Sequence, residues 1–246
     1  MLAVDALPGL PEVRAGDGLA ALLATAGARL DPPLGRTDVL AVAHKVVSKA
    51  EGRVRGLAEV EPGERARRLA AEQGKDPRLV QVILDESAEL LRADRGRLIC
   101  RTHHGFVCAN AGVDHSNAGA PDTVVLLPTD PDASARRLRT SLDVGAVVIT
   151  DSWGRAWRQG QIEVAIGCAG LSPLADWRAT PDRDGRPLAA TVIAVADEAA
   201  AAADLVRAKR SGEPAVRIRG LESYVTEEEG DGAAALIRPP EEDLFG

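Results

Sequence analysis

The sequence is poor in aromatic residues and in positive charge. Only three Trp, one Tyr and two Phe occur among 246 residues, so a surface on which nucleic-acid bases could stack is not expected. Thirty basic residues stand against 37 acidic ones, which gives a formal charge of −7 and a pI of about 5.2. This charge has the wrong sign for binding a phosphate backbone, and we expect no nucleic-acid partner.

Signals for secretion, membrane insertion and thiolate metal sites are also missing. The amino terminus contains prolines and acidic residues instead of a basic and then apolar leader. No apolar run approaches the roughly 18 residues of a membrane span. Cys100, Cys108 and Cys168 lack metal-ligand spacing and are expected to be reduced and buried. The sequence predicts a cytoplasmic protein with no membrane partner.

The two common nucleotide-binding fingerprints are absent, namely GxxxxGK[ST] and a strand-GxGxxG-helix element. With 45% hydrophobic residues, the chain can bury a core as a single domain over 1–246, or as two tightly joined subdomains. Helix and strand signals alternate irregularly, which predicts a mixed α/β (α+β) fold with no Rossmann or P-loop element. The acidic, glycine-containing stretch 222–232 is predicted to be a mobile loop.

Apolar spacing and capping residues predict the individual elements. One helix is expected to begin at Pro131 with Asp130 as its N-cap. Other helices are expected at 18–26, 62–73, 77–92 and 197–209. Strands are expected at 38–43, 97–102, 123–127, 145–150, 187–196 and 215–219. The segment 45–49 is predicted to continue the first of these strands in extended form.

Two polar segments follow predicted strands, in positions where binding groups are often mounted. The loop 109–117 consists mostly of small residues and carries Asp114 and Asn117. The segment 149–161 carries Asp151 and Ser152. Carboxylate, hydroxyl and amide oxygens suit a hard ion such as Mg²⁺ or Mn²⁺, which keeps waters and phosphate oxygens in its shell. The residues therefore predict a phosphate-metal site.

Each feature also has a simpler interpretation. A single Asp after a strand is most often a turn residue or a helix cap, and lysines at a strand end often only solvate it. His103 and His104 are expected to be a polar loop pair, because no third ligand is spaced to complete a zinc site. Arg155 and Arg158 suit contacts to a substrate carboxylate or phosphate, but they could equally pair with surface carboxylates.

A series of short motifs runs in order from residue 9 to the end of the chain. They are GLPE at 9–12, KVVSKAEG at 45–52, KDPR at 75–78, GFVCANAGVD at 105–114, DPDASA at 130–135, DSWGRAWR at 151–158, GQ at 160–161, the alanine-rich 196–205, RGL at 219–221 and EDLF at 242–245. This series resembles the coenzyme F420-0:L-glutamate ligase family. The resemblance implies the fold of that family, in which intertwined mixed sheets carry flanking helices, and a homodimer.

The resemblance also implies a function. The family uses GTP and Mg²⁺ or Mn²⁺ to join L-glutamate to coenzyme F420-0 through a γ-glutamyl amide, by way of an acyl phosphate. A monovalent cation is a further expected cofactor. The family's nucleotide contacts fall on Gly9, Leu10, Pro11, Glu12, His44, Lys49 and Asn117. Its metal ligands fall on Asp114, Asp151 and Ser152, and the expected catalytic groups are Asp114, Asp151 and Lys49.

Two positions and the chain end depart from the family pattern. Residue 44 is His where relatives commonly carry a smaller or an amide side chain, which changes the chemistry of a nucleotide contact. Residue 209 is Lys where some relatives have a Gln that supports a second metal. Its charge either replaces that metal or only complements a helix end. Some relatives continue into a flavin-dependent reductase domain, so we expect a stand-alone ligase or a ligase domain without that extension.

Two other functions remain open from the sequence alone. A ligase or kinase of the same fold could act on a different carboxylate, because the substrate pocket cannot be derived from sequence. A non-catalytic nucleotide-binding subunit is the second alternative, which the presence of Asp114, Asp151 and Lys49 disfavours.

Overall fold

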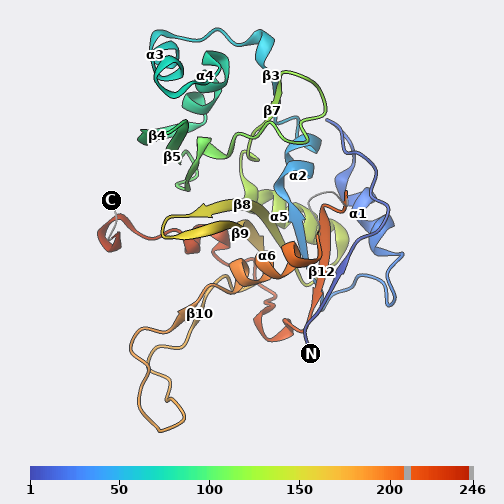
Figure 1. Cartoon of the computed structure of the whole chain (residues 1–246). Coiled ribbons are helices and arrows are strands. Elements are labelled where there is room, and N and C mark those ends of the chain that lie inside the picture. Colours follow the sequence, from blue (N-terminus) through green and yellow to red (C-terminus); the bar gives the residue numbers. More distant parts are fainter. Residues whose placement is uncertain (208–211, 244–246) are drawn as a thin grey trace.

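A five-stranded mixed sheet forms the centre of the molecule (Figure 1). The computed structural model describes residues 1–207 and 212–243. The strand order is β1-β12-β2-β8-β9, with β2 and β8 parallel and the other neighbouring pairs antiparallel. The strands are β1 Ala3–Ala6, β2 Val39–Ala43, β8 Ala146–Arg155, β9 Arg158–Ala169 and β12 Ala215–Arg219. Together with its helices, this sheet confirms the predicted mixed α/β class.

Helices cover both faces of the sheet. The first face packs against α1 Leu19–Gly27, α2 His44–Ala50 and α5 Pro131–Leu142, and the second against α6 Val195–Val206. Strand side chains alternate, so Val147 and Ile149 of β8 enter the first core whereas Val148 enters the second. The α6 helix contributes mainly alanines to the second core. These small side chains allow the helix to lie close to the sheet.

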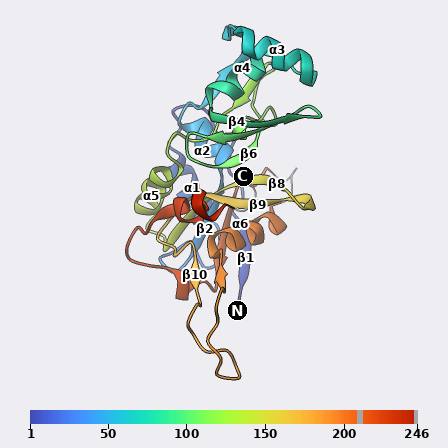
Figure 2. The ribbon, with the colours of Figure 1, turned by 90° about the vertical axis from the view of Figure 1, so that its left-hand side faces the viewer.

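A smaller part of the chain lies at one end of the sheet, uppermost in Figures 1 and 2. Its elements are β3 Val54–Gly56, α3 Glu64–Gln73, α4 Pro77–Asp85, β4 Ser87–Asp94, β5 Arg97–Thr102, β6 Val107–Ala109 and β7 Thr123–Val125. Strands β4, β5 and β6 form one sheet and β3 pairs with β7. Apolar residues such as Leu69, Ile83 and Leu98 form a core cluster of their own.

The remaining chain forms an arm and a series of short turns. The arm extends away from the sheet between β10 Ala175–Asp176 and β11 Val192–Ile193 (Figure 1). The 3-10 turns are η1 Leu57–Glu59, η2 Asn110–Gly112, η3 Glu222–Tyr224, η4 Gly232–Leu236 and η5 Pro240–Glu242. Within the acidic segment, the Thr226 N–H donates to the Gly170 carbonyl at 2.9 Å and Arg139 donates to the Thr226 carbonyl at 2.6 Å. The mobility of the segment 222–232 remains a prediction.

Most expected elements are found within a few residues of their predicted positions, but the bounds predicted for one helix and one strand were wrong. The helix predicted over 77–92 ends at Asp85, and 87–94 forms β4 instead. A turn with positive φ at Arg95 and Gly96 brings β4 back against β5, so strand pairing overrides the local helical spacing. The strand predicted over 187–196 shrinks to Val192–Ile193, because α6 already begins at Val195.

Two further corrections change the geometry of the predicted site. The segment 45–49, predicted to be extended, belongs to helix α2. The segment 149–161, treated as a polar loop after a strand, is the hairpin formed by the long strands β8 and β9. The alternation of Ile162, Val164 and Ile166 with other residues was a usable strand signal in the sequence.

Candidate functional site

Helix α2 starts where strand β2 ends, beside the middle of its parallel neighbour β8. Ala43, the last residue of β2, is in register with Thr150 of β8. His44, the first residue of α2, and Asp151, the next residue of β8, therefore lie beside one another. Asp151 lies far from α2 in the sequence, and only the parallel pairing of β2 and β8 brings it there.

Asp151 is held from several sides. His44 Nε2 lies 3.2 Å from Asp151 Oδ1 without the alignment of a hydrogen bond, and the His44 side chain is only 2% exposed. The Trp153 indole N–H donates to Asp151 Oδ2 at 2.9 Å, and the Ser152 amide donates to Oδ1 at 2.8 Å. Burial raises the pKa of Asp151, but the neighbouring His44 side chain and these hydrogen bonds outweigh the effect of burial and leave the pKa of Asp151 below its ordinary value. Asp151 is therefore a carboxylate at neutral pH.

Asp114 is paired with a lysine of the same helix. The Lys45 ammonium lies 2.7 Å from Asp114 Oδ2 and donates to Ser116 Oγ at 2.5 Å. The Ser116 amide donates to Asp114 Oδ1 at 2.7 Å. Burial raises the pKa of Asp114, but the hydrogen bonds from Lys45 and Ser116 lower it below the ordinary value. Asp114 is therefore a second carboxylate beside the start of α2.

Lys49 extends the charged site by one helical turn. Residues four apart share a face of a helix, so Lys45 and Lys49 lie on the same side of α2. The Lys49 ammonium contacts Glu12 Oε1 at 2.5 Å, and the side chain is 9% exposed. The contact connects α2 to the segment 9–12. Lys49 and Glu12, two of the residues that the resemblance assigns to nucleotide binding, thus lie in contact.

A cavity of about 440 Å³ lies beside Glu12. It is lined by Pro11, Glu12, Arg14, Asp17, Gly18, Ala21 and Leu22. Gly9 adopts a positive φ of 71°, and a Cβ there would collide with the Arg29 guanidinium, which donates to the Gly9 carbonyl at 3.2 Å. Leu10 packs against the first core cluster. The backbone of 9–12 is therefore fixed at the mouth of a concave surface.

The structure places Ser152 away from Asp151. Successive residues of a strand point to opposite faces, so Ser152 faces the α6 side while Asp151 faces α2. The Ser152 hydroxyl donates to Glu163 Oε1 on β9. The prediction that both side chains bind a metal ion assumed that this segment is a loop. In strand β8 the Asp151 and Ser152 side chains point to opposite faces and do not lie together.

Asn117, Arg155 and Arg158 lie outside this cluster of contacts. Asn117 is exposed and has a positive φ of 56°, which Asn tolerates better than most residues. Arg155 donates to the Gln159 carbonyl at 2.7 Å and stabilises the β8–β9 turn. Arg158 is an exposed residue at the start of β9. Lys209 lies outside the described residues.

The donor set suits a metal that takes most of its ligands from substrate and water. In residues 1–207 and 212–243, no three His, Cys, Asp or Glu side chains are grouped to hold an ion. Asp114 and Asp151 nevertheless supply two carboxylates, and in the structure Asp114 is paired with the Lys45 ammonium. Two carboxylates complemented by phosphate oxygens and waters are a common Mg²⁺ environment. The two residues therefore fit such an ion, whereas the Ser152 hydroxyl does not join them.

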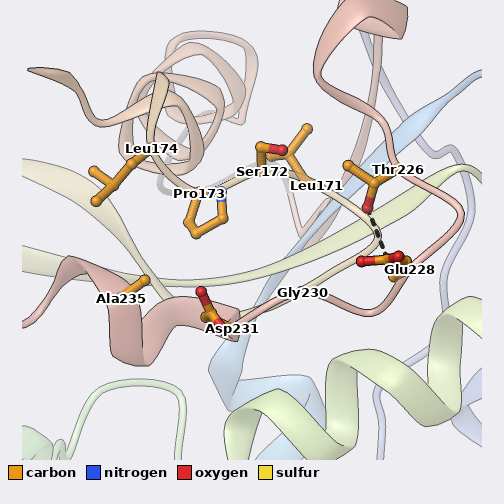
Figure 3. Close-up of a pocket in the computed structure, with 9 residues that line it drawn as sticks. All are labelled: Leu171, Ser172, Pro173, Leu174, Thr226, Glu228, Gly230, Asp231 and Ala235. Carbon is orange, nitrogen blue, oxygen red and sulfur yellow. Dashed lines mark hydrogen bonds between the residues drawn. The ribbon is translucent and has the colours of Figure 1, made fainter. Parts of the chain in front are cut away.

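A second cavity, of about 270 Å³, lies under the C-terminal turns (Figure 3). Its lining residues are Leu171, Ser172, Pro173, Leu174, Thr226, Glu228, Gly230, Asp231 and Ala235. The Thr226 hydroxyl donates to the Glu228 carbonyl at 2.7 Å. None of these residues is a predicted site residue, and the cavity is separate from the charged cluster on α2.

The histidine and cysteine predictions agree with the structure. His103 and His104 contact backbone carbonyls, with the shortest distance, 2.9 Å, from His104 Nε2 to the Pro128 carbonyl. All three cysteines are free and buried, and burial raises the pKa of Cys108 and Cys168 to about 12. Among the described residues, no helix is both long and apolar enough to cross a membrane.

Lysines and ionised carboxylates that meet in a half-buried cluster are typical of an enzyme site for a charged substrate. Comparison with known proteins identifies the family. A sequence model described as F420-0:Gamma-glutamyl ligase matches residues 9–220. The chain belongs to this family, and it is a ligase.

Named relatives cover nearly the full length of the chain. The coenzyme F420:L-glutamate ligase of Methanopyrus kandleri is 46% identical over 99% of this chain and 97% of its own length. The enzyme of the same name from Methanothermobacter thermautotrophicus is 43% identical over 96% of each chain. That from Halobacterium salinarum is 45% identical over 97% of this chain and 93% of its own.

Proposed function

We propose that this ligase uses GTP to add L-glutamate to coenzyme F420-0 in coenzyme F420 biosynthesis. The first amide joins a carboxyl group of F420-0 to the glutamate amine, and γ-glutamyl amides form where further glutamates are added. Family membership and the names of the relatives support the substrates. The observation that carries the chemical proposal is the position of two ionised carboxylates against consecutive residues of α2. His44 contacts Asp151 and Lys45 contacts Asp114, with Lys49 one turn further along the helix.

In this proposal the nucleotide lies along the segment 9–12 with its phosphates toward α2. Lys49 contacts Glu12 in the structure. When the nucleotide binds, a phosphate group replaces Glu12 as the partner of the Lys49 ammonium, which neutralises phosphate charge. Gly9 allows the backbone to turn toward the ligand, and Pro11 and Glu12 line the adjacent cavity. Asn117 remains a proposed nucleotide contact from its position in the loop 109–117, which also carries Asp114. His44 is proposed to act near the nucleotide through its contact with Asp151.

The reaction needs an activated carboxyl group, because a free carboxylate is a weak electrophile and a poor acyl donor. A carboxylate oxygen of F420-0 attacks the γ-phosphorus of GTP, and GDP leaves. The amine of L-glutamate then attacks the carbonyl carbon of the acyl phosphate, and phosphate departs with the oxygen that it received. The amine loses its proton as the amide forms. Positioning and charge neutralisation are the main contributions that a protein makes to the phosphoryl step.

The chain's own groups have separate roles in this scheme. Asp114 and Asp151 hold the divalent ion, Mg²⁺ or Mn²⁺, which when bound neutralises phosphate charge. Lys45 keeps Asp114 ionised and oriented in the absence of that ion. Trp153 and the Ser152 amide orient the Asp151 carboxylate. Arg158 is a proposed contact for an anionic group of the substrate. A homodimer, a cytoplasmic location and a monovalent cation also belong to the proposal.

The test is a reconstituted reaction with purified protein, F420-0, L-glutamate, GTP and Mg²⁺. Mass spectrometry should find a product heavier by one or more glutamyl residues, and formation of GDP should match the number added. Reactions without Mg²⁺, or with ATP in place of GTP, should give little product. A glutamylated product formed without any nucleotide would disprove the proposed chemistry. GTP consumption with a different carboxylate but not with F420-0 would disprove the substrate.

A further inference from the structure

A buried polar network lies on the α6 side of β8, opposite the charged site. Arg207, at the end of α6, lies 2.6 Å from Glu163 Oε2 and donates to Thr150 Oγ1 at 3.0 Å. The Ser152 hydroxyl donates to the other oxygen of Glu163. The Arg207 and Glu163 side chains are only 9% and 7% exposed. The network thus links two strands of the sheet to the end of a helix.

The residues that this network holds are the two neighbours of Asp151. Thr150 and Ser152 point to the α6 face, while Asp151 between them points to the α2 face. Ser152 is in register with Glu163, and the β8–β9 register shifts between Ile149 and Thr150. Irregularities of this kind often occur next to active sites, where they redirect a side chain. The backbone on both sides of Asp151 is therefore held by contacts on the α6 face of the sheet, opposite the face to which Asp151 points.

The orientation of the Asp151 carboxylate depends directly on that backbone. Its Oδ1 accepts a hydrogen bond from the Ser152 amide at 2.8 Å, and Trp153, one residue further along the same strand, donates to Oδ2. A displacement of β8 at Ser152 would move both donors. Glu163 accepts a hydrogen bond from the Ser152 hydroxyl, and Arg207 donates hydrogen bonds to Glu163 and Thr150. These bonds hold the side chains of Ser152 and Thr150 in place.

We propose that Glu163, held by Arg207, is a positioning residue that acts through Ser152 and Thr150 to orient Asp151 for metal-dependent nucleotide binding. The inference rests on the proposed function. Stability alone does not account for the pair, because apolar residues of similar volume often replace a buried ion pair without loss of stability. Groups that orient a metal ligand without touching the metal typically affect metal affinity by ~10–100-fold.

Two variants test the role. Glu163→Gln keeps an acceptor for Ser152 but removes the ion pair, and it leaves the Arg207 charge buried. The double variant Glu163→Gln/Arg207→Met removes both charges. It leaves no unpaired buried charge, so a loss of binding in this variant cannot be caused by misfolding around such a charge. The matched control is Asp5→Asn, which removes the partner of another buried arginine. Arg217 lies 2.8 Å from Asp5 and its side chain is 2% exposed, but this pair lies on β12 and β1 at the opposite edge of the sheet.

The measurement is the affinity of each purified protein for a hydrolysis-resistant GTP analogue, with and without Mg²⁺, together with thermal unfolding. We expect Mg²⁺ to strengthen binding in the wild type and in Asp5→Asn. In both Glu163 variants this Mg²⁺-dependent gain should fall by ~10-fold or more, while affinity without Mg²⁺ stays within about twofold of wild type.

The possible outcomes separate the inference from the proposed function. A full Mg²⁺-dependent gain in a folded Glu163 variant would overturn the positioning role while leaving the proposed function intact. An equal loss in Asp5→Asn would also overturn it, since the effect would then be general destabilisation. The absence of any Mg²⁺-dependent gain in the wild type would overturn both the inference and the metal-dependent part of the proposed function.

Discussion

At the residue scale, the proposed chemistry depends first on Asp114 and Asp151. Changing either residue to Asn keeps the shape of the side chain but removes one negative charge from the ion site. We expect turnover to fall on the order of 10³-fold, comparable with the loss of one charge-neutralising group in phosphoryl transfer. Steady-state rates of GDP formation in Asp114→Asn and Asp151→Asn provide the measurement, with circular dichroism to confirm folding. Turnover near that of the wild type in either variant would remove that residue from the ion site.

The two lysines of α2 should have different roles, although they share one face of the helix. Lys49→Ala should raise the KM for GTP by roughly 10- to 100-fold, since a hydrogen bond to a charged group contributes about 1.5–3 kcal/mol. Lys45→Ala should instead change the Mg²⁺ requirement, because Lys45 contacts Asp114. Titrations of activity with GTP and with Mg²⁺ distinguish the two effects. Lys75→Ala, on the loop between α3 and α4, is the control, and identical shifts in both α2 variants would show that the roles are assigned incorrectly.

The sequence predicted how site side chains are grouped only where it also predicted the correct secondary structure for their segment. Asp114, Asp151 and Lys49 were identified from motifs, and the structure places Asp114 and Asp151 against successive residues of α2. Ser152 was grouped with Asp151 because the segment was taken as a loop, and a strand separates their side chains. No role was predicted for Lys45 by itself, and the contact of Lys45 with Asp114 could not be derived from local sequence.

At the scale of elements, helix α5 shows where local rules are sufficient. Asp130 and Pro131 predicted its start, and the Asp130 carboxylate accepts a hydrogen bond from the Ala133 amide at 2.8 Å. Both residues act within the first turn, so no distant contact is needed. Helix α4 shows the opposite case, because the chain after it pairs with β5 and local spacing could not reveal that partner.

The cap on α5 gives a stability prediction. Asp130→Ala should lower the free energy of unfolding by ~1 kcal/mol, the usual effect of losing such a cap. Asp130→Asn should have a much smaller effect, because its amide oxygen can accept the same bond. Urea unfolding of the three proteins provides the comparison. Equal stability of Asp130→Ala and wild type would mean that the cap does not contribute to folding stability.

At the scale of the whole molecule, the site exists because distant segments meet at one sheet edge. The mixed fold was predictable from alternating signals, but the parallel pairing of β2 with β8 joins residues more than a hundred positions apart. No local rule specifies that pairing. It places His44 beside Asp151 and so converts separate motifs into one site.

Acid should weaken the whole fold partly through this site. Asp114 and Asp151 have pKa values below the ordinary value, which is about 3.9 in an unfolded chain. Their stabilisation is therefore fully present above pH ~4 and is lost as the pH falls through the folded-state values. Urea unfolding at neutral pH and below pH ~4 should show a smaller loss of stability in Asp151→Asn than in wild type. An equal loss in both proteins would show that Asp151 does not contribute to this pH dependence.

The central claim is that GTP activates a carboxyl group of the acceptor as an acyl phosphate. The most direct test uses F420-0 whose acceptor carboxylate is labelled with ¹⁸O, in a reaction with unlabelled GTP, L-glutamate and Mg²⁺. Phosphoryl transfer to that carboxylate predicts that the released phosphate carries one labelled oxygen and that the new amide keeps the other. Released phosphate without label, in a reaction that still forms glutamylated product, would contradict the account.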